Sequence, residues 1–487
     1  MTPTEPGTAP AAAAPALPSA RDAVADFARR FARAHRAWSE GGPSAELDAW
    51  REQQLAAVLE KASTRSSFYR RHLAGVDLAA VRPDDLRALP FTTKDDLRRE
   101  QADVLSGDLR EAAFYYETTG TTGPTTPCPR DEREILASNA NVAASWRAVL
   151  GRHLGGVRPV VALMGPTEIH SFGDTLGDVA RDVGACAVKI WPYSPVVGFR
   201  RALELLRELR VQVVVATPGV LLNLARAAER QGVDLRRDLA VEVLFVTGEI
   251  CTDALAAVLD DLWGATTYDV LYGSQEALVL GVACPSGRLR LAEPNCLPEV
   301  LDPATGEVLG ARGRGELCVT MLVDGVKPLI RYRTGDLVDL HDAPSGPGEL
   351  PGPVVEVLGR VADGVPLGAG SATPKEIESA VLEGVRGCFG YQVLLDRVDE
   401  RDLVTVRLQF SRAARAGAGA TAAAVRDRVA GRFGVACEVE VVDELDGRVS
   451  TGAFVSWKAA RVVDRRRGED HEARTAAELG RRRGIDT

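Results

Sequence analysis

Five short apolar runs alternate with amphipathic stretches between about residues 110 and 280, and this alternation constrains the fold more than any other feature. The strands that it predicts are Val157–Met164, Cys186–Ile190, Val211–Thr217, Val241–Thr247 and Thr266–Leu271. The helices that it predicts are Ser171–Val183, Gly198–Leu209, Val220–Gln231 and Thr252–Leu262. Such alternation is typical of βαβ units and largely parallel sheets. Ligands bind these sheets at the carboxyl ends of the strands, so we expect a site there.

Other patterns flank this region. The spacing of apolar residues predicts helices over Ser19–His35 and Ala45–Thr64. Short strands separated by Gly/Pro turns predict a small antiparallel subdomain from about 290 to 360. The elements predicted after it are helices Lys375–Leu382 and Thr421–Phe433, strands Gly390–Leu395, Leu403–Phe410 and Glu438–Val442, and a low-complexity connector over Ala413–Ala423. These form a compact α+β unit of independent-domain size.

The predicted class is therefore α/β. A large N-terminal domain over 19–362 combines mixed and parallel sheets, flanking helices and the antiparallel subdomain, and a small α+β C-terminal domain covers 363–464. Residues 1–18 are rich in Pro and Ala, and we expect a disordered leader there. Residues 465–487 are expected to form a charged tail with few apolar side chains.

Composition excludes several classes of function. The 487 residues carry a net charge of −9, which gives no general attraction to nucleic acid. No apolar run approaches the roughly 20 residues that span a membrane, and the N-terminus lacks the basic segment of a signal peptide. A cytoplasmic location is expected. The eight cysteines are scattered without close pairs, which favours reduced thiols over a disulfide framework.

The run Tyr115–Pro129 concentrates glycine and threonine. Its central residues are Thr118, Thr119, Gly120, Thr121, Thr122 and Gly123. Glycines free the backbone to curl, and hydroxyls beside exposed N–H groups are typical of loops that wrap oxyanions such as phosphates. The run lacks the Gly-Lys-Ser/Thr ending of a Walker loop, and an ordinary surface loop is the alternative.

Five further motifs accompany this loop. They are Leu89–Arg98 (LPFTTKDDLR), Thr247–Glu249 (TGE), Tyr272–Glu276 (YGSQE), Arg331–Leu337 (RYRTGDL) and Lys458–Asp464 (KAARVVD). In this order and spacing the six motifs resemble the adenylate-forming superfamily of acyl-CoA synthetases and luciferases, over about residues 45–465. The first motif and the segment PLIRYRTGDL look most like the phenylacetate–CoA ligase branch.

The resemblance implies an AMP-forming acid–thiol ligase that uses ATP, Mg²⁺ and coenzyme A. A carboxylate attacks the α-phosphate of ATP to give an acyl-adenylate and pyrophosphate, and a thiol then displaces AMP. Between these halves the C-terminal domain of the family rotates, so residues 363–464 are expected to be mobile. The branch suggests an aromatic or related small carboxylic acid in secondary metabolism. A dimer is the plausible state for the family, while the sequence itself fixes no oligomeric state.

By this resemblance, Thr118–Gly123 wraps the β- and γ-phosphates. The family's loop carries Lys after its last Gly, whereas Pro124 stands there in this chain, and Arg130 is a substitute for that missing cation. Glu276 matches the family's Mg²⁺ ligand, because a hard cation suits a carboxylate oxygen. The alternative for Glu276 is an exposed loop residue.

The same resemblance assigns the nucleotide side of the site. The residues implied to contact adenine are Gly248, Glu249, Asp269, Tyr272 and Gly273. Asp336 matches the family's Asp that binds both ribose hydroxyls, and Arg360 matches an Arg near the ribose and phosphate. A core position for Tyr272 and a structural turn for Asp336 are the alternatives. The hinge that usually follows as an acidic pair reads Ala362-Asp363, which makes Asp363 the expected pivot.

Lys458 matches the family's mobile catalytic lysine, which bridges the carboxylate and the α-phosphate oxygens. Trp457 replaces the usual Gly before it, while Arg461 keeps the usual Arg three residues on. The alternative for Lys458 is a surface lysine in a basic tail. We expect Lys458→Ala to reduce adenylation and Asp336→Ala to weaken nucleotide binding.

The acyl pocket is expected near Gly165–Asp174, between a strand and a helix. Its predicted wall residues are His170, Phe172 and Asp174, with Tyr193 and Ala216–Gly219 on the opposite side. For Asp174, a helix N-cap is the competing and favoured role.

Three cysteines lie in a region where related sequences carry a structural zinc. They are Cys251, Cys284 and Cys296, with Cys318 as a fourth ligand. No Cys-x-x-Cys pair or nearby His accompanies them, so buried reduced thiols are the favoured interpretation.

Two other functions compete with the ligase hypothesis. Pro124 and Trp457 leave open adenylation with transfer to a carrier-protein thiol, an amine or nitrite in a biosynthetic pathway. A non-catalytic homologue that binds nucleotide or acyl ligand is the second alternative, and the retention of Glu276, Asp336 and Lys458 argues against it.

Overall fold

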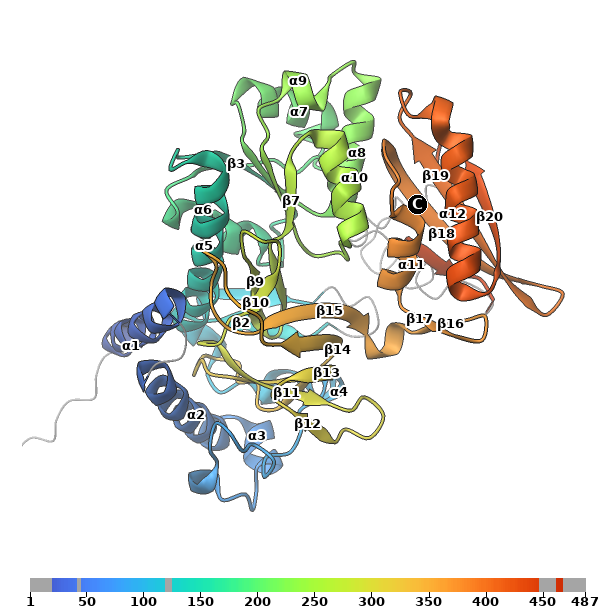
Figure 1. Cartoon of the computed structure of the whole chain (residues 1–487). Helices are drawn as coiled ribbons and strands as arrows, with labels where there is room; N and C mark the ends of the chain where they lie inside the picture. The colour runs from blue at the N-terminus through green and yellow to red at the C-terminus, as the bar shows by residue number, and fades with distance from the viewer. Residues whose placement is uncertain (1–19, 42–44, 119–124, 446–460, 467–487) are drawn as a thin grey trace, which may run out of the picture.

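The computed structural model describes residues 20–41, 45–118, 125–445 and 461–466, and Figure 1 shows how they are arranged. A five-stranded parallel sheet has the order β4-β3-β5-β6-β7. Its strands are β3 (Val160–Met164), β4 (Cys186–Lys189), β5 (Val213–Ala216), β6 (Val243–Val246) and β7 (Thr266–Asp269). All five strands predicted by the alternation are confirmed, each with shorter ends.

Helices cover both faces of this sheet, because its strands are buried on both sides. They are α6 (Phe172–Asp182), α7 (Gly198–Glu208), α8 (Pro218–Arg230), α9 (Leu235–Asp238) and α10 (Asp253–Trp263). Along β3, Ala162 and Met164 join one core with α7, α8 and α10, whereas Val161 and Leu163 join another with α6. The two cores therefore lie on opposite faces of the sheet.

A long helix that the alternation did not predict, α5 (Glu132–Leu154), lies between this sheet and a second one. It begins with a reciprocal capping box between Asp131 and Glu134. Trp146 packs against Phe245 of β6, with ring centroids 5.0 Å apart, while the Ser145 hydroxyl donates to a carbonyl of the second sheet. Because α5 is buried on several sides, it lacks a continuous polar face. The alternation of apolar and polar residues with a period of 3.6, which identifies an amphipathic helix, is therefore weak in its sequence.

The second sheet is antiparallel and has the order β12-β11-β13-β14-β15-β10-β9-β8. Its strands are β8 (Leu271–Ser274), β9 (Leu278–Ala283), β10 (Leu289–Leu291), β11 (Cys296–Leu301), β12 (Val308–Gly310), β13 (Gly313–Met321), β14 (Tyr332–His341) and β15 (Val354–Arg360). The predicted antiparallel subdomain is confirmed in kind but is larger. It begins at Leu271, because β8 and β9 fold back as a hairpin and β9 pairs with β10.

The N-terminal part is helical and packs against the antiparallel sheet and α5. It comprises α1 (Ala20–Gly41), α2 (Ala45–Arg65), α3 (Ser67–His72) and α4 (Lys94–Glu100). The two predicted helices are confirmed, and Phe27, Phe31 and Trp50 pack ring against ring between them. A hairpin of β1 (Phe114–Glu117) and β2 (Pro127–Arg130) precedes α5. Among the described helices, none is long and apolar enough to cross a membrane.

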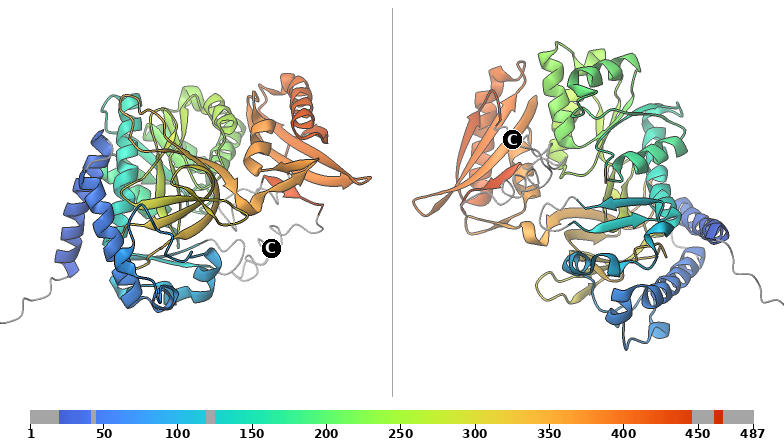
Figure 2. Two further views of the ribbon diagram at one scale, coloured as in Figure 1. Left: turned by 60° about the horizontal axis from the view of Figure 1, so that its bottom comes forward. Right: turned by 180° about the vertical axis from the view of Figure 1, so that it is seen from behind.

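The C-terminal part is a four-stranded sheet of order β20-β19-β18-β21 with two helices. Its elements are β16 (Val365–Leu367), β17 (Gly370–Ala372), α11 (Pro374–Leu382), β18 (Cys388–Val398), β19 (Arg401–Phe410), α12 (Ala418–Phe433), β20 (Ala436–Val441) and β21 (Val462–Asp464). Figure 1 shows this part beside α8 and α10, and Figure 2 shows the same arrangement from two other sides. The predicted connector over Ala413–Ala423 is wrong in its second half, because α12 begins at Ala418 in an alanine-rich segment that favours helix.

The predicted leader and most of the predicted tail lie outside the described residues. Arg465 and Arg466 of the tail are described. Arg466 pairs with Asp464 at 2.8 Å and with Asp402 at 3.0 Å, so this first part of the tail is anchored to the C-terminal sheet. The division of the chain at residue 363 remains a prediction.

Candidate active site

Two residues that follow β6 and one that ends β7 lie where a parallel sheet places its ligands. Gly248 has φ +85°, a conformation that glycine adopts without strain. The Glu249 carboxylate accepts from the Gly219 N–H at 3.1 Å, which ties it to the start of α8. Asp269 is the last residue of β7, and burial raises its pKa to about 7, with Lys375 opposing the shift. Of the residues predicted on the adenine side, Glu249 thus has a hydrogen-bonded carboxylate and Asp269 a buried carboxyl group.

Asp336, Tyr272 and Arg360 form a contact group on the antiparallel sheet. Asp336 of β14 lies opposite Arg360 of β15, and the Arg360 Nε is 3.5 Å from Asp336 Oδ1. The Tyr272 hydroxyl donates to Asp336 Oδ2 at 2.8 Å. Burial raises the pKa of Asp336, and Arg360 and Tyr272 partly offset that effect. The carboxylate is held in a fixed orientation that suits a bidentate contact with two hydroxyls.

Tyr272 and Gly273 also have structural roles in the β8–β9 hairpin. The Tyr272 ring is buried in the core beneath the antiparallel sheet, so the core interpretation of this aromatic is confirmed. A Cβ at Gly273 would lie 2.2 Å from the Leu278 carbonyl oxygen, which explains why glycine stands there without reference to a ligand. The adenine contacts of both residues remain predictions.

Glu276 is buried, which contradicts the exposed-loop interpretation. The Lys94 Nζ lies 3.1 Å from Glu276 Oε1, and the exposed fractions of the two side chains are 33% and 4%. Burial by itself raises the pKa of Glu276, but Lys94 and Lys327 outweigh it and bring the pKa to about 2. The carboxylate is therefore ionised at neutral pH and retains the hard oxygen donors that Mg²⁺ prefers.

Lys94 and Lys327 are site residues that the sequence analysis did not single out. Lys94 opens α4, where Thr93 and Asp96 form a reciprocal capping box. The motif LPFTTKDDLR was recognised, but its lysine was not assigned a role. The chain contains only six lysines, so each one could have been considered as a candidate site residue from the sequence.

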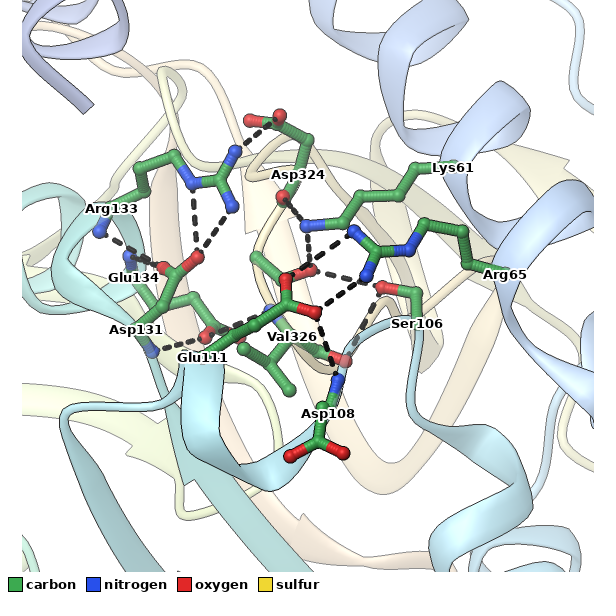
Figure 3. Close-up of polar contacts among 11 residues, drawn as sticks. Lys61, Arg65, Ser106, Asp108, Glu111, Asp131, Arg133, Glu134, Asp324 and Val326 are labelled. Carbon is green, nitrogen blue, oxygen red and sulfur yellow. Dashed lines mark hydrogen bonds and ion pairs between the residues drawn. The ribbon is translucent and has the colours of Figure 1, made fainter. Parts of the chain in front are cut away.

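The segment that precedes Lys327 is held by a polar cluster, which Figure 3 shows. The Lys61 ammonium of α2 donates to the carbonyl oxygens of Asp324 at 2.6 Å and Gly325 at 2.8 Å. The Ser106 hydroxyl donates to the Gly325 carbonyl at 3.0 Å. These contacts fix the backbone immediately before Lys327, whose Nζ lies 3.2 Å from the buried Cys128 Sγ.

The same cluster joins the segment before Lys327 to the start of α5 (Figure 3). Arg133 pairs with Asp131 at 2.7 Å and with Asp324 at 2.9 Å. Glu134 accepts from the backbone N–H of Val326 at 3.3 Å. A Cβ at Gly325 would lie 2.2 Å from the Glu134 side chain, so this close approach requires glycine.

The described part of the Thr/Gly loop is its base. Thr118 closes the β1–β2 hairpin, because its N–H donates to the Thr126 carbonyl at 3.2 Å and its Oγ1 accepts from the Thr126 N–H at 3.0 Å. The predicted phosphate-binding residues beyond it, Thr119, Gly120, Thr121, Thr122 and Gly123, lie outside the described residues. So does Pro124.

Arg130, the expected substitute cation, is buried at the end of β2. Its guanidinium lies over the Tyr116 ring at 5.4 Å and donates to the Gln275 carbonyl at 3.4 Å. Gln275 directly precedes Glu276 in the chain, so Arg130 reaches this segment. Its guanidinium, however, is already engaged by these protein groups. Lys94 and Lys327 are the cations that most lower the pKa of Glu276, and Arg130 also interacts electrostatically with this carboxylate.

The four predicted acyl-pocket residues do not share one wall. Phe172 is buried in the core on the α5 and α6 side of the parallel sheet, and its ring leaves no space for a Cβ at Gly165. Tyr193 packs against the core on the opposite face and accepts from Asn223 Nδ2 at 2.5 Å. The half-buried His170 follows Ile169, whose carbonyl accepts from the Glu117 N–H at 3.1 Å.

Asp174 is not an N-cap. Ser171 holds that position, and Asp174 lies in the first turn of α6. Its Oδ2 accepts from the Tyr116 hydroxyl at 3.0 Å, and its Oδ1 lies 3.9 Å from the Lys189 Nζ. Asp174 therefore joins α6 to the hairpin that carries the Thr/Gly loop.

The proposed zinc ligands are not brought together. Cys296 and Cys284 are buried in two different cores, and Cys251 packs against a third. Cys318 lies on β13, 4.0 Å from a Glu299 oxygen. No three His, Cys, Asp or Glu side chains of the described chain form a group that would hold a metal ion. All eight cysteines are free thiols, which agrees with the interpretation as reduced cysteines.

The C-terminal motif is described only in part. Lys458 and Trp457 lie outside the described residues, so the catalytic role of Lys458 stays a prediction. Arg461 is described, and its Nη2 lies 2.5 Å from Glu249 Oε2. Asp363 ends a short 3₁₀ turn, Val361–Asp363, and is exposed as a pivot requires, but its role in a hinge also stays a prediction.

Comparisons with known proteins agree with the motifs. No family model matches the chain. A phenylacetate–coenzyme A ligase from Pseudomonas putida is 29% identical over 397 residues, which cover 77% of this chain and 85% of that protein. A 2-hydroxyisobutyryl-CoA ligase in its postadenylation state, with 20% identity, superposes with a TM-score of 0.75 over 92% of this chain and 94% of that one.

The same ligase in its thioesterification state gives a TM-score of 0.58, with 21% identity over 93% of this chain and 94% of that one. The overall arrangement of this chain is thus nearer to the postadenylation structure. The fold, the ordered motifs and the curated relatives agree, and together they support a resemblance to the adenylate-forming superfamily, in its phenylacetate–CoA ligase-like branch.

Proposed function

We propose that this chain activates a small carboxylic acid with ATP, releasing pyrophosphate, and then transfers the acyl group from AMP to coenzyme A. One observation carries the proposal. Two groups with the chemistry that adenylation needs, Asp336 with Tyr272 and Glu276 with Lys94, lie on adjoining elements near the ends of the two sheets. The charge of Lys94 acts on both carboxylates, which supports one shared site.

The oriented Asp336 carboxylate binds the ribose hydroxyls, and Arg360 beside it supplies positive charge toward the phosphates. Lys94 and Lys327 favour the build-up of negative charge on the leaving pyrophosphate. In this proposal they take the role of the family's loop lysine, whose sequence position is held by Pro124 in this chain.

The residues present also fit Mg²⁺. Mg²⁺ is usually held by one or two carboxylates together with substrate phosphates, and Glu276 offers an ionised carboxylate. When bound, the ion would neutralise phosphate charge. Lys94 already contacts one Glu276 oxygen, so the lysine and the ion share this carboxylate between them.

The acid is proposed to be aromatic, since the Pseudomonas putida relative is a phenylacetate–coenzyme A ligase. The test is pyrophosphate release with ATP and Mg²⁺ over a panel of aryl, amino-aryl and short aliphatic acids, with and without coenzyme A. We expect an acid-dependent signal and an acyl-CoA product detected by mass. Pyrophosphate release without a thioester product would indicate that the acyl acceptor is a carrier-protein thiol, an amine or nitrite instead of coenzyme A. No release with any acid would contradict the proposal.

A further inference from the structure

Arg461 joins the C-terminal part of the chain to the nucleotide side of the site. Its Nη2 lies 2.5 Å from Glu249 Oε2, and its Nη1 lies 3.3 Å from Glu378 Oε2. Its guanidinium also lies over the Tyr391 ring, 5.5 Å from the centroid. The Arg461 side chain is 9% exposed and each of the two carboxylates 4%, so this is a buried cluster.

Each carboxylate of the cluster is also fixed by backbone. Glu249 follows β6 and accepts from the Gly219 N–H at 3.1 Å, whereas Glu378 lies on α11. Glu378 Oε1 accepts from the Thr252 N–H at 3.0 Å, which is the N-terminus of α10 in the large part of the chain. The Tyr391 hydroxyl donates to the other oxygen of Glu378. Both Arg461 and Glu378 therefore cross from the C-terminal part to the large one.

Charge makes Arg461 the member that holds this cluster together. Burial lowers the pKa of Arg461, but Tyr391, Glu249 and Glu378 outweigh it and raise the pKa above its ordinary value, so the group stays charged. Without it, two buried carboxylates on opposite sides of the contact would lose their shared cation, and breaking a buried pair is strongly destabilising.

Across the same boundary the Gly387 N–H also donates to Asp261 Oδ2 at 2.8 Å, and other polar contacts are exposed. Arg230 of α8 pairs with Glu444 at 3.1 Å, and the side chains are 62% and 78% exposed. Exposed pairs of this kind contribute little because water screens them. The buried cluster is thus the contact whose loss should change how the two parts sit together.

We propose that Arg461 is a positioning residue that holds the C-terminal sheet against α8 and α10 for adenylation and releases it for thioester formation. The inference rests on the proposed function, in which the two halves need different arrangements of the chain. Glu249 directly follows the adenine-side turn, so the cluster joins the C-terminal part to the predicted nucleotide contact. The overall arrangement, nearer to a postadenylation structure than to a thioesterification structure, agrees with this assignment.

The test separates the two half-reactions in the full-length protein. Adenylation is measured as ATP–pyrophosphate exchange without coenzyme A, and thioester formation is measured from supplied acyl-adenylate and coenzyme A. We expect Arg461→Met to reduce exchange about 10²-fold, because a small misplacement carries a cost of that order. Thioester formation should change by less than about threefold, since the second half does not use this contact.

Arg461→Lys and Arg230→Ala are the matched variants. Lys keeps the charge but cannot bridge two carboxylates with a fork, so its exchange rate should fall between those of the wild type and Arg461→Met. Arg230→Ala removes an exposed contact across the same boundary and should leave both halves unchanged. Equal losses in both halves, or no loss in exchange, would overturn the proposal.

Small-angle scattering provides a readout that needs no activity. We expect a larger radius of gyration for Arg461→Met than for the wild type, with thermal unfolding showing that the variant is folded. If the wild type is inactive in both halves, the proposed function fails. In that case the scattering measurement by itself still tests whether Arg461 positions the C-terminal sheet. An unchanged radius of gyration in Arg461→Met would overturn that role.

Discussion

The Lys94 ammonium lies 3.1 Å from the Glu276 carboxylate, which connects the start of α4 with the hairpin that follows the parallel sheet. Lys94 is 33% exposed, whereas Glu276 is almost fully buried. The lysine therefore reaches the site from its open side. If ATP binds here as proposed, Lys94 would supply a cation near its phosphates, although Pro124 stands where the family carries the loop lysine.

We expect Lys94→Met to lower the kcat of adenylation about 10²-fold, because a charge that stabilises the leaving pyrophosphate is lost. Stopped-flow or coupled detection of pyrophosphate release measures the effect. Lys94→Arg keeps the charge and should retain most of the rate. An unchanged kcat for Lys94→Met would remove this residue from the mechanism.

Asp336→Ala should weaken ATP binding, because a hydrogen-bonding carboxylate and its orienting contacts with Tyr272 and Arg360 are removed. The expected increase in Kd is about 10- to 100-fold, which is typical for losing hydrogen bonds to a charged group. Isothermal titration calorimetry with ATP measures it. Asp339→Ala, at a half-exposed position on the same strand, is the control. Equal Kd values for the two variants would contradict the ribose assignment.

Lys458→Ala is predicted to reduce adenylation steeply, by about 10²-fold or more, while leaving ATP binding nearly intact. The reason is that this lysine is expected to contact the reacting carboxylate and α-phosphate rather than the nucleoside. ATP–pyrophosphate exchange and calorimetry on the same preparation separate the two effects. Near-normal exchange would show that the interpretation of the C-terminal motif is wrong.

Asp269 should make folding stability depend on pH. Its pKa is raised from an ordinary value of 3.8 to about 7, so between these pH values the folded chain keeps a proton that the unfolded chain has released. The folded state binds more protons, and the free energy of unfolding therefore falls as pH rises through this window. Asp269→Asn should reduce that fall.

Urea unfolding at about pH 5 and pH 7.5 measures this difference, and Asp84→Asn at an exposed position is the control. The free energy of unfolding should fall less between the two pH values in Asp269→Asn than in the wild type, by roughly 1 kcal/mol or more. One unit of pKa shift corresponds to about 1.4 kcal/mol. A wild-type slope in Asp269→Asn would contradict the raised pKa.

The parallel sheet was predictable because its strands and helices differ sharply in period and composition. Helix α5 was not, because Ser138, Asn141 and Ser145 are buried between two sheets and blur its apolar face. The place of the β8–β9 hairpin in the antiparallel sheet was not predictable, because it depends on β10, which pairs with the distant strand β15.

In the candidate site, too, residues in local motifs were predictable, whereas contacts between distant parts of the chain were not. Motifs identified Asp336 and Glu276, and the structure places each with charged or hydroxyl partners. Lys327 could not be connected to Glu276 from sequence, because the position of the lysine depends on a polar cluster drawn from α2, α5 and the segment before it (Figure 3). The acyl pocket stays a prediction, and the structure shows only that Phe172 and Tyr193 pack against cores on opposite faces of one sheet.

The central claim is that this site forms an acyl-adenylate. The most direct measurement is exchange of labelled pyrophosphate into ATP without coenzyme A, in the presence of phenylacetate and related acids, for the wild type and Asp336→Ala. We expect acid-dependent exchange in the wild type and its loss at limiting ATP in the variant. Exchange that is absent with every acid, or that is equal in the two proteins, would contradict it.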